Sequence, residues 1–239
     1  MLNINAFAPR IEAAVSTALG MDVRIEGKIG IALIPGFGLS MENVTVRNKG
    51  LDVAKIEKVK IGLKLIPSAW FRIEIHQVEL IKPVFTIARS TDGMFGLERP
   101  ARTSGEEIRA VNTISIAQGS LVYIDETAGE TIEAGDLDLS IKNLFVSRTN
   151  SAEPFRAISF YGDIKCKTFK IYGLTLMNLV MSVAGDKGLF DINLVDMNIA
   201  GGTGIGSIHV DMTEPSPQYK LTCKLNRVRI EELLDLYAL

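Results

Sequence analysis

The sequence predicts a mostly β protein with a helix near each end, and three observations predict it. Apolar and polar residues alternate with a period of two over most of the 239 residues. Turn-forming residues interrupt the alternation about every dozen residues. Helical spacing of apolar residues is confined to the two ends of the chain. Because successive side chains of a strand point to opposite faces, a series of such strands makes an antiparallel sheet with one continuous apolar side.

The segment that ends at Gly20 is expected to form a helix. Pro9 suits its first turn and Gly20 suits its end. We predict that this helix caps one end of a β core. Its apolar stripe consists of Phe7, Ile11, Ala14, Val15, Ala18 and Leu19.

The alternation begins after Gly20 and is clearest between Lys55 and Leu97. Pro-Gly, Pro-Ser and Lys-Pro steps divide it, and we interpret the runs on either side of each step as separate strands. The last run of this region is expected to end in the turn Ser90-Thr91-Asp92-Gly93. The alternating runs are Val23–Leu33, Leu39–Val46, Val59–Leu65, Ile73–Leu80 and Phe85–Ile87.

Residues 98–110 have no period and are predicted to form a loop or linker. We therefore divide the chain into residues 1–98, a helix followed by the first strands, and residues 99–239, which continue the same β structure. The alternative is a long connection within one continuous sheet.

The second half is expected to consist of further short strands and a short terminal helix at Ile230–Leu236. Asp125 to Gly129 has the composition of a turn, as has the segment with Pro215 and Pro217. The predicted strands are Ile114–Ile116, Leu121–Ile124, Leu137–Ile141, Ile158–Phe160, Ile164–Cys166, Phe169–Ile171, Leu174–Leu176, those within Leu189–Ile199, Ile208–Met212 and Tyr219–Leu225.

Composition argues against nucleic acid as a partner. The chain has 26 Lys and Arg against 28 Asp and Glu, so it lacks a basic footprint, and its aromatic residues are scattered rather than grouped for base stacking. No run is long and apolar enough to cross a bilayer. The two cysteines, Cys166 and Cys223, are too few for a disulfide framework. We favour two small buried residues, and the alternative is one disulfide in an oxidising compartment.

The search for catalytic or metal-binding residues yields no reaction centre. His76 and His209 lie in strands without acidic residues or cysteines at metal-ligand spacing, so we predict neither a metal nor a cofactor. The Gly-rich segment from Gly201 to Gly206 is followed by a strand, whereas a phosphate-binding loop requires a following helix. We interpret its alternating glycines as a bulge or as a place where backbones approach closely. An enzyme is therefore not expected.

Several segments, taken in order, resemble the AsmA family. The N-terminal ones are Pro9–Ala14, Ala18–Gly20, Val23–Gly27, Ile29–Leu33, Pro35-Gly36, Leu39–Val46, Val59–Pro67, Ile73–Leu80, Pro83 and Asp92-Gly93. The C-terminal ones are Gly202-x-Gly204-x-Gly206, Tyr219–Leu225, Val228-x-Ile230 and Leu233-Leu234. Each position is degenerate, so the specificity lies in the order of the segments.

The resemblance implies a periplasmic protein of the bacterial envelope, anchored to the inner membrane by a segment that would precede Leu2 and belong to the full-length protein. It also implies a long twisted antiparallel sheet, curled into an open apolar groove that carries phospholipid in outer membrane biogenesis. The residues expected to line this groove are Ile29, Ile31, Leu33, Val59, Ile61, Leu63, Leu65, Ile73, Ile75, Leu137, Leu139, Ile141, Leu221 and Leu225. Two alternatives stay open: an assembly factor for outer-membrane proteins with an exposed strand edge, and a structural β domain with a dry core.

Overall fold

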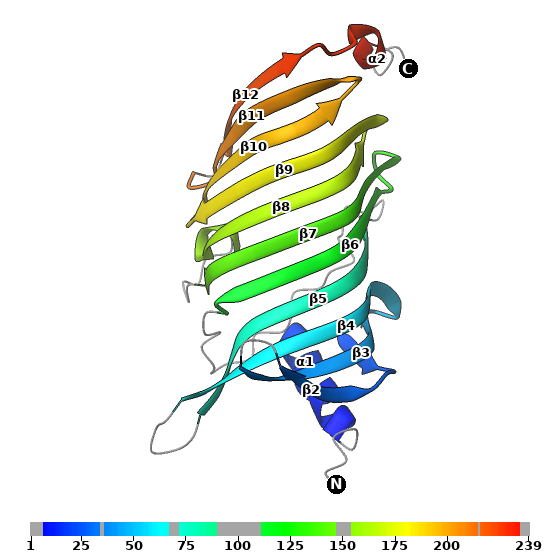
Figure 1. The fold of residues 1–239 in the computed structure, drawn as a ribbon, viewed down its shortest axis with the longest axis vertical. Coiled ribbons are helices and arrows are strands. Elements are labelled where there is room, and N and C mark those ends of the chain that lie inside the picture. The colour runs from blue at the N-terminus through cyan, green and yellow to red at the C-terminus, as the bar shows by residue number, and fades with distance from the viewer. Residues whose placement is uncertain are drawn as a thin grey trace. The chain divides into compact units, whose positions relative to one another are not determined.

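The computed structural model describes residues 7–33, 36–66, 72–89, 111–146, 154–214 and 216–234, and its strands hydrogen-bond side by side (Figure 1). In chain order the elements are α1 (Ala8–Leu19), β1 (Asp22–Ile25), β2 (Ile29–Leu33), β3 (Phe37–Asn48), β4 (Leu51–Ile66), β5 (Arg72–Arg89), β6 (Thr113–Asp125), β7 (Glu130–Val146), η2 (Pro154–Ala157), β8 (Ile158–Ile171), β9 (Leu174–Asp186), β10 (Leu189–Ile199), β11 (Gly202–Asp211), β12 (Gln218–Asn226) and α2 (Ile230–Leu234). The strand order is β1-β3-β4-β5-β6-β7-β8-β9-β10-β11-β12, with β2 paired to β3. The predicted mostly β fold, an open sheet with an N-terminal helix and a short C-terminal helix, is confirmed.

The chain consists of two compact units, which we describe one at a time. Unit 1 comprises Met1–Glu106 and Ile116–Thr131, and unit 2 comprises Glu107–Ser115 and Ile132–Leu239. The predicted division between residues 98 and 99, and the predicted linker up to residue 110, lie outside the described residues.

Two-residue turns connect several neighbouring strands. Both residues of each turn have positive φ, as the twist of an antiparallel hairpin requires. Glycine adopts such φ values without steric cost, and it is the second residue of every one of these turns. The turns are Lys49-Gly50, Tyr172-Gly173, Lys187-Gly188 and Ala200-Gly201.

The strands of unit 1 keep one apolar face although their alternation shifts by one residue in mid-strand. Asn43 in β3 has φ 52° and Lys82 in β5 has φ 47°, both in the left-handed region. Such a residue resets the alternation of side chains, although the pairing of β3, β4 and β5 keeps its register at these two positions. Apolar side chains on the same face are therefore separated by three positions at Met41/Val44 in β3 and Leu80/Pro83 in β5. Ile56 and Val59, which pair with them from β4, have the same separation.

These shifts correct the predicted strand boundaries. The Lys82-Pro83 step lies inside one continuous strand, β5, which joins two runs that we predicted as separate strands. Likewise β8 joins three predicted short strands, and β10 is continuous where polar breaks were expected. A shift in alternation resembles a strand end in the sequence, but the hydrogen-bonded pairing continues through it.

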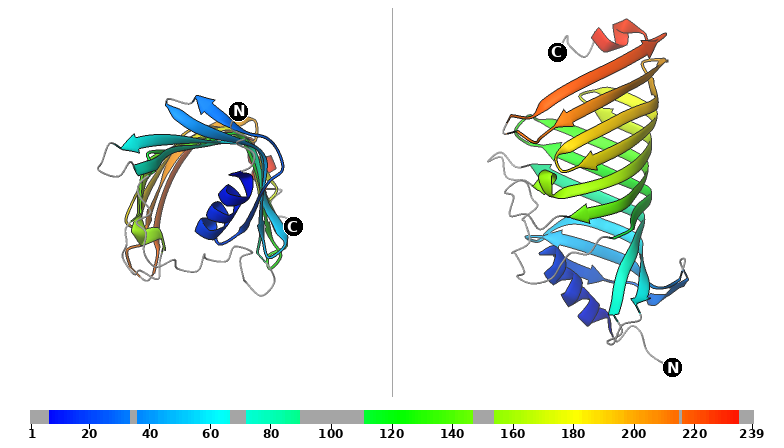
Figure 2. Two further views of the ribbon diagram at one scale, coloured as in Figure 1. Left: turned by 90° about the horizontal axis from the view of Figure 1, so that it is seen from below. Right: turned by 90° about the vertical axis from the view of Figure 1, so that its left-hand side faces the viewer.

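The core of unit 1 lies between the sheet and α1. Buried side chains from β1 to β4 form one cluster, and Ala8, Ile11 and Val15 of α1 pack against it. Figure 2 shows α1, in dark blue, on one face of the blue and cyan strands. The cluster consists of Val23, Ile29, Met41, Val44, Ala54, Ile56 and Val59, with exposures of 4–7%.

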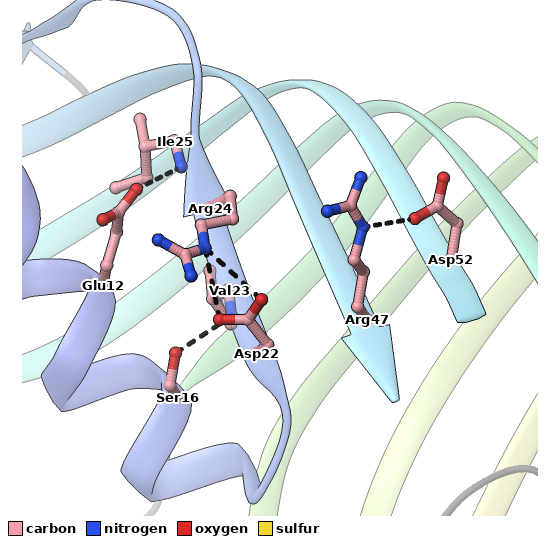
Figure 3. A network of polar contacts seen from close by, with 8 residues as sticks. All are labelled: Glu12, Ser16, Asp22, Val23, Arg24, Ile25, Arg47 and Asp52. Atoms are coloured by element: carbon pink, nitrogen blue, oxygen red, sulfur yellow. Dashed lines mark hydrogen bonds and ion pairs between the residues drawn. The ribbon is translucent and has the colours of Figure 1, made fainter. Parts of the chain in front are cut away.

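Helix α1 also closes the free edge of the sheet at β1 (Figure 3). The backbone N–H of Val23 donates a hydrogen bond to the Ser16 hydroxyl at 2.9 Å, and that of Ile25 donates to the Glu12 carboxylate at 2.7 Å. Residues four apart on a helix rise by about 6 Å, which matches the distance between alternate residues of a strand. Gly20, with φ 67°, ends the helix as predicted. The predicted capping role of this helix is therefore confirmed.

The pairing of β5 with β6 departs from the predicted all-antiparallel sheet. The carboxyl ends of the two strands lie together, because the N–H of Glu126 donates to the carbonyl of Arg89 at 3.0 Å and the Arg89 guanidinium donates to Asp125 at 3.2 Å. Neighbouring strands whose carboxyl ends meet run parallel. A parallel pair requires a long crossover, and the chain between these strands includes the aperiodic segment seen in the sequence.

Unit 2 contains an antiparallel meander from β7 to β12, in which each strand pairs with the next one along the chain. Its strands show the same mid-strand shift as those of unit 1, with Asp136 in β7 and Asn178 in β9 in the left-handed region. Helix α2 follows β12, and the Arg229 N–H just before it donates to the carbonyl of Ala200 at 3.0 Å.

Candidate functional site

One face of the sheet in unit 2 is apolar from β7 to β12, and we call it the apolar face of unit 2. The cross-strand pairing aligns its side chains in rows perpendicular to the strands. The rows contain glycine and apolar residues and no charged side chain. They are Ala134-Phe169-Leu176-Ile199-Gly202, Leu137-Cys166-Leu179, Leu139-Ile164-Met181-Leu194-Gly206-Cys223, Ile141-Gly162-Val183-Ile192-Ile208-Leu221, Phe160-Gly185-Phe190-Val210-Tyr219 and Met197-Gly204-Leu225.

Little of the described chain covers this face. Among the described residues of unit 2, no helix longer than the single turn of η2 and no second sheet packs on it. Most of its large side chains are consequently half-buried, and on β12 the exposure reaches 69% for Leu221 and 67% for Tyr219. Full burial is limited to a few of its apolar side chains: Ala134, Cys166, Leu179, Met197 and Ile199.

The opposite face of unit 2 is polar and carries cross-strand ion pairs. The Lys170 ammonium lies 2.9 Å from Glu133, and that of Lys142 lies 3.6 Å from Asp163. All of these side chains are about half exposed or more, so each pair contributes at most about 1 kcal/mol. The two faces therefore differ in chemistry, because the ion pairs lie on the side of the sheet opposite the apolar face.

An aromatic group lies at one end of the apolar face. Phe155 of η2 contacts Phe190 edge to face, with ring centroids 6.4 Å apart, and Phe160 lies 6.3 Å from Phe190 on its other side. Gly185, between the two strands that carry these rings, has no room for a Cβ, which would lie 2.7 Å from the Phe160 ring. The Arg156 guanidinium holds η2 in place by donating to the carbonyl of Met212 at 2.7 Å.

The residues predicted to line a lipid groove in unit 1 fall into different environments. Ile29 and Val59 belong to the cluster beneath α1, and Ile61 packs against it. Leu63 is half-buried, whereas Ile31 and Ile75 are 56% and 47% exposed. The side chains of Leu33, Leu65 and Ile73 lie outside the described residues, although their backbones belong to β2, β4 and β5.

The predicted lining residues of unit 2 all lie on its apolar face. Leu137, Leu139 and Ile141 are half-buried on β7, and Leu221 and Leu225 are exposed on β12. Lipid contact itself stays a prediction. The sequence-based selection left out the residues between these two strands, although their alternation was visible: Ile164, Met181, Val183, Ile192 and Leu194.

The alternate glycines of the Gly-rich segment, Gly202, Gly204 and Gly206, lie on the apolar face of β11, where we predicted either a bulge or a close approach of backbones. A Cβ on Gly202 would overlap the carbonyl oxygen of Asn226, and one on Gly206 would overlap that of Thr222. Glycine at these positions lets β12 approach β11 closely. Of the two interpretations, the close approach is confirmed, and the pairing of β11 with β12 has no bulge.

Cys223 corrects the prediction of two buried cysteines. Cys166 is 3% exposed, and its thiol lies 3.1 Å from the carbonyl of Thr168, but Cys223 is exposed on β12. Burial raises the pKa of the Cys166 thiol. Three strands separate the two residues, and both are free thiols, so this fold does not allow them to form one disulfide.

The described residues contain no group of three or more His, Cys, Asp or Glu side chains that could hold a metal ion. His209 lies 2.7 Å from Asp191 across the polar face. Neither helix in the described part of the chain is long and apolar enough to span a membrane.

Comparison with known proteins identifies one family. The model of the AsmA family matches residues 1–163 of the 239. The C-terminal segments of the resemblance, residues 202–234, lie outside the matched range. Searches of the curated proteins and of the solved structures found no match.

Proposed function

The chain belongs to the AsmA family, and we propose that it is a non-enzymatic lipid-transfer or lipid-shielding protein of the bacterial envelope. In this proposal it lies in the periplasm and is held at the inner membrane by an anchor of the full-length protein. It carries phospholipid acyl chains on the apolar face of its sheet between the inner and outer membranes.

The single observation that supports this proposal is the apolar face of unit 2, which the described residues of that unit leave largely uncovered. Large contiguous apolar patches are uncommon on soluble monomers and mark sites for another apolar surface. Here uncharged rows run across six consecutive strands, and their exposure rises to 69% at Leu221. Aliphatic side chains of this kind fit hydrocarbon, which requires contact and no hydrogen bonds.

The energetics favour a surface without anchors over a deep pocket. Burial of one methylene is worth about 0.8 kcal/mol, so a 16-carbon chain gains on the order of 10 kcal/mol on leaving water. The rows offer the chain similar aliphatic contacts at each step from β7 to β12, so no position traps it. The lipid head group would stay in water beside the sheet.

The proposal is tested by two substitutions at neighbouring positions of β10. Leu194→Glu places a charge in the middle of the apolar face, whereas Asn193→Glu places the same charge on the exposed polar face. Each protein is purified from cells without detergent, and its bound phospholipid is measured by solvent extraction and phosphorus assay. We expect phospholipid on the wild type and on Asn193→Glu, and a loss of at least about tenfold on Leu194→Glu.

Two results would count against the proposal. One is a wild-type protein that carries no phospholipid and does not accept fluorescent phospholipid from vesicles. The other is equal retention by the two variants, which would place any lipid elsewhere. A lipid-free wild type with a dimer interface over the apolar face would favour the structural alternative with a dry core.

A further inference from the structure

The edge strand β12 differs from the other edge of the described sheet. Among the described residues, β12 pairs with β11 on one side and with no strand on the other. All nine of its residues are exposed, and its pairing with β11 is regular from Gln218 to Asn226. It has no proline or bulge, and no helix in the described part of the chain covers it. Of the devices that protect strand edges, it has only charged side chains, Lys220 and Lys224. By contrast, Glu12 and Ser16 occupy the free edge of β1.

The lysines of β12 also depart from the pattern on the polar face elsewhere in the chain. A lysine in or next to a strand commonly pairs with an acidic residue of the adjacent strand. These pairs are Lys58–Glu42, Lys60–Glu79, Lys82–Glu57, Lys142–Asp163, Lys167–Asp136 and Lys170–Glu133. Lys220 and Lys224 instead face His209 and Ile205 of β11. No ion pair involves either lysine within the described part of the chain.

We infer that β12 is a docking edge for an extended segment of a partner protein, in which aliphatic residues alternate with acidic residues. The partner strand would take the free edge of β12 by main-chain hydrogen bonds. Its carboxylates would face Lys220 and Lys224, and its aliphatic side chains would extend the rows that end at Leu221 and Leu225.

The same charges disfavour a second copy of this chain as the occupant. An antiparallel β12 pair that overlaps over all nine residues places Lys220 of one copy opposite Lys224 of the other. Like charges directly opposite each other destabilise a strand pair, whereas opposite charges stabilise it. The two lysines therefore exclude one partner and select another.

The experiment uses the full chain and three labelled nine-residue peptides. The acidic peptide is Thr-Val-Glu-Ile-Thr-Val-Glu-Ile-Thr, the basic peptide has Lys in place of Glu, and the third has the acidic composition in an order without alternation. Affinities are measured by fluorescence anisotropy, and amide hydrogen exchange locates the binding. We expect the wild type to bind the acidic peptide about tenfold more tightly than the basic one, with slower exchange confined to β12.

A charge swap makes the inference falsifiable even if a variant is destabilised. The double variant Lys220→Glu/Lys224→Glu is expected to reverse the preference and to bind the basic peptide more tightly, a gain that misfolding cannot produce. The matched control Lys165→Glu/Lys187→Glu has the same change of net charge away from β12 and is expected to keep the wild-type preference.

Three results would overturn the inference: no discrimination between the acidic and basic peptides, a preference that survives the swap, or a dimer protected at β12. Failure of the lipid proposal would appear separately, as absence of phospholipid from the wild type. The charge swap lies on the polar face, so it is expected to leave bound phospholipid unchanged.

Discussion

Units 1 and 2 have the same kind of apolar sheet face in different surroundings. In unit 1, Ile11 and Val15 of α1 lie over the face, and the cluster beneath is 4–7% exposed. In unit 2, no described element longer than η2 lies on the face, and Leu221 and Leu225 are 69% and 47% exposed. The alternation that produces both faces is similar. The comparison teaches that an apolar row becomes core or surface according to what packs on it.

The two outer edges of the sheet differ in the same way. At β1, Glu12 and Ser16 accept hydrogen bonds from backbone N–H groups that would otherwise face water. At β12 the described chain supplies no such acceptors. One helix thus covers both a face and an edge in unit 1, and unit 2 has no equivalent among its described residues.

Placing one charge in each face tests most directly whether the two faces differ in burial. Val44→Glu would bury an unpaired carboxylate beneath α1, and we expect it to destabilise unit 1 by on the order of 4 kcal/mol. Leu194→Glu leaves its carboxylate able to reach water and should destabilise unit 2 by about 1 kcal/mol. Hydrogen exchange of β3–β4 and of β9–β10 measures each unit by itself. Equal losses would mean that unit 2 has a covered core as well.

The edge contact of α1 should have a smaller effect. Glu12→Ala removes the charged acceptor of the Ile25 N–H. We expect the free energy of unfolding of unit 1 to fall by about 1–2 kcal/mol. Faster exchange of the Ile25 amide is the measurement. Thr17→Ala is the control, because the Thr17 hydroxyl is exposed and donates to the carbonyl of Ala13 within the helix. Unchanged exchange at Ile25 would show that water satisfies this edge equally well.

The turn after β6 should give unit 1 an acid sensitivity. Desolvation raises the pKa of Asp125, but hydrogen bonds from the N–H groups of Ala128 and Thr127 and from Arg89 outweigh it and hold the pKa below its ordinary value. A lowered folded-state pKa contributes stability above the unfolded pKa, and this stability is lost as pH falls through the folded value.

We therefore expect the Thr127 and Ala128 amides to lose protection below about pH 4, as NMR-detected exchange would measure. Asp125→Asn should remove this pH dependence, because an amide does not titrate in this range. A pH dependence that persists in Asp125→Asn would assign the effect to another carboxylate.

The reactivity of the two thiols measures how exposed β8 and β12 of unit 2 are, without altering the stability of the unit. Burial raises the pKa of Cys166 and shields its thiol, whereas Cys223 is exposed. At pH 8 we expect iodoacetamide to modify Cys223 at least about tenfold faster than Cys166. Raising the pH should accelerate Cys166 only as its thiolate forms. Phospholipid bound to the apolar face should slow the reaction of Cys223, and equal rates with and without lipid would place the acyl chains away from β12.

The sequence predicted the helix ends and the turn whose conformation depends on residues that are neighbours in the chain. Pro9 and Gly20 marked the two ends of α1, and the composition of residues 125–129 marked the turn after β6. The prediction of short strands was wrong at Lys82, where φ 47° shifts the alternation inside one strand. A lysine in the left-handed region has no signature in the sequence, because glycine, asparagine and aspartate are the residues that usually adopt this conformation.

By itself, the sequence determined that this protein is a mostly β chain with one apolar and one polar side to each strand, because side-chain direction follows from the backbone period alone. The tertiary structure was needed to show that β5 and β6 run parallel, that Val59 is core while Leu221 is surface, and that β12 has no second partner strand among the described residues. These features depend on contacts between residues far apart in the chain. The same alternating pattern is compatible with either outcome until those contacts form.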